Sequence, residues 1–274
     1  IKQNAITIAD SGSLTTAADK IALNDANSAI ANNGSLTLTG GTNNNAITGD
    51  GTTTISGTVT NNATIGQDVA ISANKDDTQK GNLTNTGTIS GAVTNAGTLD
   101  NTNGTITGNV TNSGTLTSAA ENLQGAIANN ADGALKLSGT LDKIISGAGT
   151  TNINGELAFE SNANIEGTLN MNGGTLDLLG SKGEDEGDDD TSNKITDHKI
   201  GKLAGTGTIK IDSDMSGDGS ADRLIVGSGS DATVTIDSIN ITKEHDTIIP
   251  SESAPEDKHI QVIGGEGAYG VSIV

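Results

Sequence analysis

One seven-residue phrase recurs three times between Leu83 and Leu116. Leu-Thr-Asn-Thr-Gly-Thr-Ile begins at Leu83, Val-Thr-Asn-Ala-Gly-Thr-Leu at Val93 and Val-Thr-Asn-Ser-Gly-Thr-Leu at Val110, and a looser copy begins at Val59. A short unit of this kind cannot bury its own apolar side chains. Its repetition therefore favours a chain in which equivalent segments stack on one another. The intervals between the four starting positions are unequal. This irregular spacing predicts a solenoid with loops of variable length.

Composition favours an all-β solenoid over a conventional globular core. The chain has 38 Gly, one Phe (Phe159), one Tyr (Tyr269), no Trp and a net charge of −20. Few large hydrophobic residues and a high charge also occur in disordered chains. However, Ile, Leu and Val recur between threonines, and stacking would bury each of them for roughly 1.5–3 kcal/mol. We therefore expect a folded chain.

Charge and composition exclude several classes of function. The chain has only 14 Lys and Arg against 34 Asp and Glu. No basic stripe is available, so nucleic acid is not an expected partner. No apolar run is long enough for a membrane span, and no signal peptide is recognisable at the start. With no cysteine, disulfides and thiolate metal sites are excluded. We expect no cofactor.

The repeat beginning at Val93 illustrates the predicted strand. Alternation places Val93 and Leu99 inside and Thr94 and Thr98 outside, with Asn95 at the bend and a glycine at the corner. Asn favours turns. Because coils stack about 4.8 Å apart, asparagines of successive coils are expected to hydrogen-bond as a ladder.

The composition changes near residue 180. Of the 34 acidic residues, 19 lie in the last 94 positions, and the acidic run 180–190 is expected to be an exposed loop. We therefore predict a parallel β-helix over residues 1–190 and a separate β cap over 191–274. Three alternating segments, Thr208–Asp212, Asp222–Val226 and Thr233–Ile236, are predicted to pair as antiparallel hairpins. Such a cap would cover the open end of the solenoid.

The repeats and the segment Gly155–Leu179 resemble passenger domains of bacterial autotransporters, in particular the AIDA-type self-associating adhesins. The segment Leu203–Ile236 is similar to their C-terminal autochaperone region. The resemblance implies a right-handed parallel β-helix that is exported to the outer-membrane surface or secreted, and that serves adhesion, aggregation or biofilm formation. The family's signal peptide and translocator barrel are not found in this chain, so membrane anchoring would require a barrel outside it.

Motifs of catalysis are weak, and we expect no enzyme. Asp10–Ser13 is similar to the nucleophile loop of serine-protease passengers, but no histidine precedes His198 and a turn is the better interpretation. Gly265–Gly270 matches a dinucleotide glycine pattern without the helix that must follow it. A glycan-processing β-helix would use paired carboxylates, yet the aromatic rings on which sugars usually stack are almost absent. A weak calcium site remains an alternative for Asp212–Asp222 or for the run Glu184–Asp190.

Outward polar residues are the candidate interaction surface. These residues are Thr84, Asn85, Thr94, Asn95, Thr98, Asp100, Thr111, Asn112 and Thr115. Stacked coils would present them as flat ladders, and copies on neighbouring cells would pair antiparallel through many weak hydrogen bonds. The sequence therefore predicts a surface adhesin that binds itself, a host surface protein or glycan, or both. The alternatives are a passive stalk or surface-layer element and, last, the glycan-processing enzyme.

Overall fold

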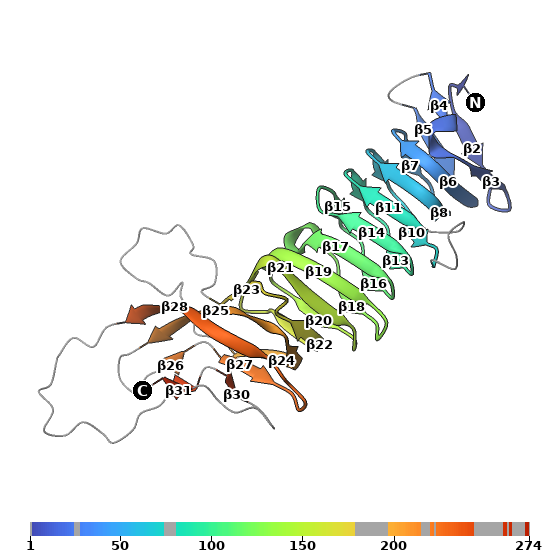
Figure 1. Cartoon of the computed structure of the whole chain (residues 1–274). Coiled ribbons are helices and arrows are strands. Elements are labelled where there is room, and N and C mark those ends of the chain that lie inside the picture. The colour runs from blue at the N-terminus through green and yellow to red at the C-terminus, as the bar shows by residue number, and fades with distance from the viewer. Residues whose placement is uncertain are drawn as a thin grey trace, which may run out of the picture. The chain divides into compact units, whose positions relative to one another are not determined.

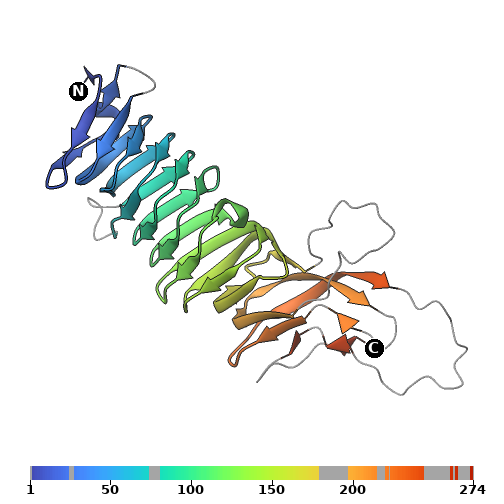
Figure 2. The same cartoon turned by 180° about the vertical axis from the view of Figure 1, so that it is seen from behind.

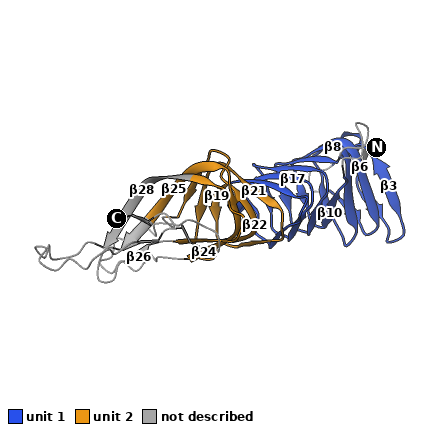
Figure 3. Ribbon diagram, turned by 60° about the horizontal axis from the view of Figure 1, so that its bottom comes forward, with its two compact units in different colours: residues 1–137 blue, residues 138–274 orange. Residues whose placement is uncertain are grey.

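The computed structural model describes residues 2–24, 28–73, 81–178, 197–214, 220–221, 223–243, 260–261, 263–264 and 272–273. It is all-β, with 62% strand and 3% helix, and its stacked parallel strands form a β-solenoid of about nine turns. The predicted parallel β-helix is confirmed. The chain divides into two compact units, residues 1–137 and 138–274 (Figure 3). The boundary expected between 180 and 200 stays a prediction, because the acidic run lies outside the described residues.

The coils of unit 1 contribute short strands to three faces. Face 1 is a six-stranded parallel sheet made of β2 (Ile6–Ile8), β5 (Ala29–Asn32), β7 (Ala46–Thr48), β9 (Thr64–Ile65), β12 (Thr88–Ile89) and β15 (Thr105–Ile106). Face 2 consists of β3 (Ser13–Thr16), the first halves of β6 (Ser35–Asn43) and β8 (Thr52–Asn61), β10 (Asp68–Ile71), β13 (Val93–Asn95), β16 (Val110–Asn112) and β18 (Ile127–Asn129).

Face 3 follows face 2 along the chain. It consists of the second halves of β6 and β8 with β11 (Asn82–Asn85), β14 (Thr98–Asn101) and β17 (Thr115–Ala119). Two 3-10 turns, Ala18–Lys20 and Ala120–Asn122, and the pair β1 (Lys2–Gln3) and β4 (Ala22–Leu23) complete the unit. The stacking of these strands within unit 1 is visible from both sides in Figure 1 and Figure 2.

The strand register explains the irregular repeat spacing. Val93 pairs with Val110, the equivalent position one coil later. Ile65 pairs with Ile89, and this coil takes more of the chain because segment 74–80 is part of it. The step from Leu83 to Val93 is short because it is less than one full turn of the solenoid: Leu83 is on face 3, and Val93 is on face 2 of the following coil. The repeated phrase therefore occupies two corners of the coil.

Aliphatic ladders fill the interior of unit 1. On face 1 one ladder consists of Ile6, Ile30, Ile47, Ile65, Ile89, Ile106 and Leu123. From Ile30 onward its members are fully buried. Each such side chain contributes about 1.5–3 kcal/mol when it leaves water. Side chains of successive coils cover one another, which replaces the aromatic core that the composition lacks.

Two asparagine ladders run beside the aliphatic ones, inside the coils. The ladder at the end of face 3 joins Asn43, Asn61, Asn85, Asn101 and Ser118, with donor–acceptor distances of 2.8, 2.8, 2.7 and 3.2 Å. The ladder at the end of face 2 joins Asn95, Asn112 and Asn129 at 2.7 and 2.8 Å. Amides of both ladders also bond backbone groups of the turns, so the predicted ladders are confirmed.

Stacked glycines allow the corners to approach closely. Gly91, Gly108 and Gly125 follow one another at the corner before face 2. A Cβ on Gly108 would lie far inside van der Waals contact with the carbonyl oxygen of Gly91, and one on Gly125 would meet Gly108 in the same way. A side chain at these positions would push successive coils apart.

Unit 2 is built on the same principle. Its strands are β20 (Ile144–Ser146), β21 (Thr150–Phe159), β22 (Asn164–Asn170), β23 (Thr175–Asp177), β24 (Asp197–Ala204), β25 (Thr206–Asp214), β27 (Arg223–Val226) and β28 (Thr233–Lys243), after β19 (Ala134–Leu141) at the boundary. One buried ladder consists of Ile145, Ile165, Ile200 and Val226. The coils of unit 2 therefore also stack in parallel.

The predicted hairpin pairing of the three C-terminal segments is wrong. β25 pairs with β28 in parallel, and β27 pairs in parallel with β24, one coil earlier, instead of with β25. Antiparallel pairing joins β25 with β26 (Ser220–Ala221) and β29 (Ile260–Gln261) with β31 (Ser272–Ile273). β30 (Ile263–Gly264) pairs in parallel with β27. Alternation of apolar and polar residues is the same in both arrangements, so it did not distinguish them.

Candidate functional site

Face 2 presents one outward residue of each coil in a single line. This face 2 row consists of Thr15, Thr37, Thr54, Ala70, Thr94, Thr111 and Ala128. Thr94 and Thr111 are exposed, while Val93 on one side of Thr94 and Asn95 on the other are buried. Because strand side chains alternate, the buried neighbours hold Thr94 outward.

Face 3 presents two parallel lines of polar residues. One line consists of Thr58, Asn82, Thr98 and Thr115, and the other of Thr42, Thr60, Thr84, Asp100 and Thr117. Asp100 is exposed, and Thr84, Thr98 and Thr115 are half-buried. One inward residue separates the two lines on each strand, such as Leu99 between Thr98 and Asp100.

The outward residues of the predicted interaction surface therefore lie on two separate faces of the solenoid. Thr94 and Thr111 are register partners on face 2. Thr98 pairs with Thr115, and Thr84 with Asp100, on face 3. The six residues share an outward position, but the corner between the faces separates the first pair from the other four.

Three predicted surface residues lie inside the coil instead. Asn85, Asn95 and Asn112 have no exposed surface and are members of the interior ladders. Their placement on the outside was wrong because each follows an outward threonine, and alternation carries the next residue inward. The cost of burying an amide is offset by hydrogen bonding to neighbouring coils. These residues cannot contact a partner.

The Asp100 carboxylate stabilises its own turn. Its Oδ1 accepts a hydrogen bond from the backbone nitrogen of Thr102 at 3.0 Å and another from the Thr102 hydroxyl at 2.7 Å. An aspartate that bonds the backbone two residues further along is a common turn device. A carboxylate has two acceptor oxygens, so Asp100 can serve its turn and still accept hydrogen bonds on face 3.

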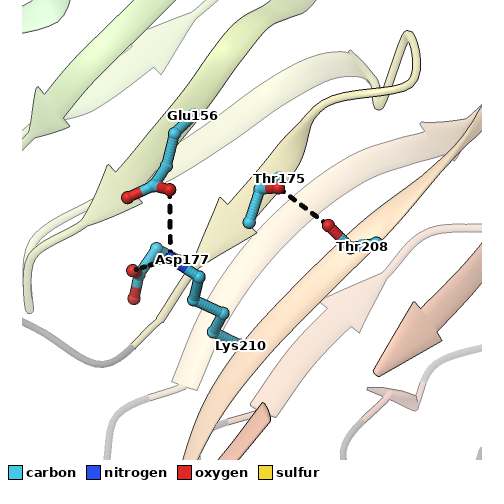
Figure 4. Close-up of polar contacts among 5 residues, drawn as sticks. All are labelled: Glu156, Thr175, Asp177, Thr208 and Lys210. Atoms are coloured by element: carbon cyan, nitrogen blue, oxygen red, sulfur yellow. Dashed lines mark hydrogen bonds and ion pairs between the residues drawn. The ribbon is translucent and has the colours of Figure 1, made fainter. Parts of the chain in front are cut away.

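A charged cluster in unit 2 was missed from sequence. Lys210 Nζ lies 3.0 Å from Glu156 Oε2 and 3.2 Å from Asp177 Oδ2, joining β21, β23 and β25 (Figure 4). Beside it, the hydroxyls of Thr175 and Thr208 lie 2.8 Å apart. The hydrogen bond to Glu156, and then that to Asp177, raise the pKa of Lys210. An ammonium held in this way is an ion-pair partner and a poor nucleophile. Only the strand register brings these residues together, because they are far apart in the sequence.

His198, the first histidine of the chain, is part of the core. His198 is buried, its Nδ1 lies 2.9 Å from the carbonyl oxygen of Ala163, and its ring packs against Phe159. His245 and His259 lie outside the described residues. That the chain is no enzyme stays a prediction.

Within the described part of the chain, no group of three or more His, Cys, Asp or Glu side chains is placed to hold a metal ion. The run Glu184–Asp190 and the side chains of Asp212–Asp222 fall outside that part. The described residues contain no helix with the length and hydropathy needed to cross a membrane. Comparisons with protein-family models, curated proteins and solved structures find no match.

Proposed function

We propose that this chain is an exported bacterial surface adhesin whose copies associate through the outer sides of faces 2 and 3. The observation that carries the proposal is the register: parallel stacking sets the hydroxyls of Thr94 and Thr111, and of Thr98 and Thr115, on neighbouring coils in straight lines. The resemblance to self-associating autotransporter passengers supports the location and the kind of partner.

Such lines suit weak and repeated contacts. One hydrogen bond between hydroxyls contributes about 0.5–1.5 kcal/mol net, so a single coil binds little. Many coils and many copies on a surface multiply the effect through avidity. The net charge of −20 opposes association at long range, and physiological salt screens it beyond about 8 Å.

Bead clumping with three matched variants tests the proposal. Each variant places lysines on two register partners: Thr94 and Thr111 on face 2, Thr98 and Thr115 on face 3, or Thr64 and Thr88 on face 1. Each changes the net charge equally, from −20 to −18. Beads coated with the native chain or the face 1 variant are expected to clump, and beads with the other two variants to stay dispersed. Equal clumping of all three variants would contradict the proposal.

A passive stalk is the second candidate function. The ladders repeat the same interior contacts from coil to coil, as a spacer requires. Dispersed beads with the native chain, together with no binding to host cells or matrix, would favour the stalk.

A further inference from the structure

His198 occupies an interior position of β24 where the neighbouring coil is apolar. Its register partner on β27 is Leu224, and only 1% of its surface is exposed. The ring centroid lies 5.3 Å from that of Phe159, with the planes inclined by 67°. The imidazole is therefore part of the packing that joins β24 to its neighbours.

The hydrogen bond to Ala163 defines the neutral state of the ring. A carbonyl oxygen only accepts, so Nδ1 carries the hydrogen and Nε2 is unprotonated when the ring is neutral. A second proton would put a positive charge into the interior. Burial lowers the pKa of His198, and this outweighs the Ala163 hydrogen bond and the Asp197 carboxylate, which raise it.

Charged residues on β24 and on the elements that pack with it do not offset that cost. They include Asp197 and Lys199 on β24, Arg223 on β27, Glu166 on β22 and Glu160 after β21. Asp197 already accepts hydrogen bonds from Nε and a terminal nitrogen of Arg223, at 2.7 and 2.5 Å. Glu166 accepts one from the backbone nitrogen of Gly147. The neighbouring carboxylate of Asp197 is thus paired with a cation that would repel an imidazolium.

The interior polar contacts of unit 1 are of a different kind. Its interior polar contacts include the asparagine ladders, and amides do not gain or lose protons in the physiological range. Mild acid can therefore change the charge of the interior histidine of unit 2, whereas the asparagine ladders of unit 1 do not titrate.

We propose that the coils of β22, β24 and β27 form an acid-sensitive element, which mild acid opens by protonating His198 while the ladder coils of unit 1 stay closed. This inference does not rest on the proposed function. It assigns a conformational response to unit 2 by itself.

The pH window follows from linkage. An unfolded histidine takes up a proton near about pH 6.5, whereas the folded coil resists it until lower pH. The contribution of the neutral His198 to the stability of the closed coils is therefore fully present above about pH 6.5. Below that pH, the equilibrium constant for opening increases about tenfold for each pH unit. At about pH 5 the expected loss is up to roughly 30-fold. The pKa of Asp197 is lowered by Arg223, so its contribution is lost only at more acid pH.

Hydrogen exchange of the whole chain tests the inference. Protection factors, which correct for the pH dependence of intrinsic exchange, are compared at about pH 7.5 and about pH 5. Peptides covering 197–204 and 223–226 are expected to lose protection, and peptides covering 93–116 to keep it. In His198→Leu the loss in unit 2 should disappear, whereas in Asp197→Asn it should persist. Equal loss in native chain and His198→Leu would overturn the inference, as would native peptides that keep their protection.

A second measurement holds even if His198→Leu folds poorly. Ring resonances of His198, His245 and His259 in the native chain give three titration curves. His198 is expected to titrate below the ordinary histidine pKa of about 6.5. A His198 midpoint at or above that value would overturn the inference.

Discussion

Asn95 donates a side-chain hydrogen bond of 2.7 Å to Asn112, its register partner one coil further along. Asn112 donates in turn to Asn129 at 2.8 Å and to the carbonyl oxygen of Gly114 at 3.2 Å. These amides are buried. The most polar residues of the repeat are therefore part of its core.

Removing one member should break the ladder on both sides. Asn112→Leu removes the acceptor of one Asn95 side-chain N–H and the donor to Asn129 Oδ1. An unsatisfied buried polar group costs about 1–3 kcal/mol. We expect a loss of about 2–5 kcal/mol in urea unfolding. Asn130 is the control, since it is exposed and its side chain bonds the Ser113 hydroxyl at the surface. Asn130→Leu should change stability by less than about 0.5 kcal/mol; similar losses for both variants would contradict the ladder's role.

Close corner packing predicts opposite effects at two glycines. Gly108→Ala pushes a methyl group into the backbone of Gly91 and should cost about 1–3 kcal/mol, as overpacking does. Gly66→Ala meets only the Ile47 carbonyl oxygen, at 3.4 Å. That variant should be neutral or slightly stabilising, because alanine restricts the unfolded chain. The melting temperatures of both variants and of the native chain measure these effects. An unchanged melting temperature for Gly108→Ala would contradict the close packing of the corners.

The Lys210 cluster should contribute a small, salt-dependent stability. Lys210→Met removes the ion pairs to Glu156 and Asp177 and keeps the side-chain stem, so the loss should be at most about 1 kcal/mol. The loss should shrink at about 1 M salt, where the screening length falls to about 3 Å. Lys199→Met is the control, because Lys199 is exposed on β24. A salt-independent difference would show that packing, and not charge, is at work.

The pH dependence of this cluster has a definite sign. The pKa of Lys210 is raised by its two carboxylates, so its contribution is present below the ordinary lysine pKa of 10.5 and is lost as pH rises through the raised value. The stability difference between native chain and Lys210→Met should therefore be constant near neutral pH and vanish in strong alkali. Urea midpoints across this range measure it, and a difference that grows with alkali would contradict the assignment.

Self-association should strengthen with salt. The net charge of −20 repels a second copy over a screening length of about 30 Å at about 0.01 M salt and about 8 Å at about 0.15 M. Clumping of coated beads should thus weaken as ionic strength falls. The opposite trend would indicate charge attraction and argue against pairing of neutral hydroxyl rows.

Local alternation predicted much of this structure from sequence. The inward Val93 and Leu99 and the outward Thr94 and Thr98 are where the period of two places them. The interior position of Asn95 follows from the same period. It was missed because the amide was assigned to the solvent-facing side of the strand on polarity alone.

Long-range register was not readable from the repeats. The repeats starting at Leu83 and Val93 look like equivalent positions of successive coils, but they start on different faces, face 3 and face 2. Lys210 meets Asp177 on the neighbouring strand, although segment 179–196 lies between them in the sequence. Parallel and antiparallel neighbours share the same alternation, so β27 was paired with the wrong strand.

Everything proposed for faces 2 and 3 depends on equivalent residues of successive coils lying in line. Because the chain has no cysteine, Thr94→Cys with Thr111→Cys carries a spin-label pair at two register partners, about 4.8 Å apart along the stack. Thr94→Cys with Thr115→Cys, on different faces, is the control. Electron paramagnetic resonance should show strong spin–spin broadening for the first pair and much less for the second. A spectrum of isolated labels for the pair at 94 and 111 would contradict the stacked register.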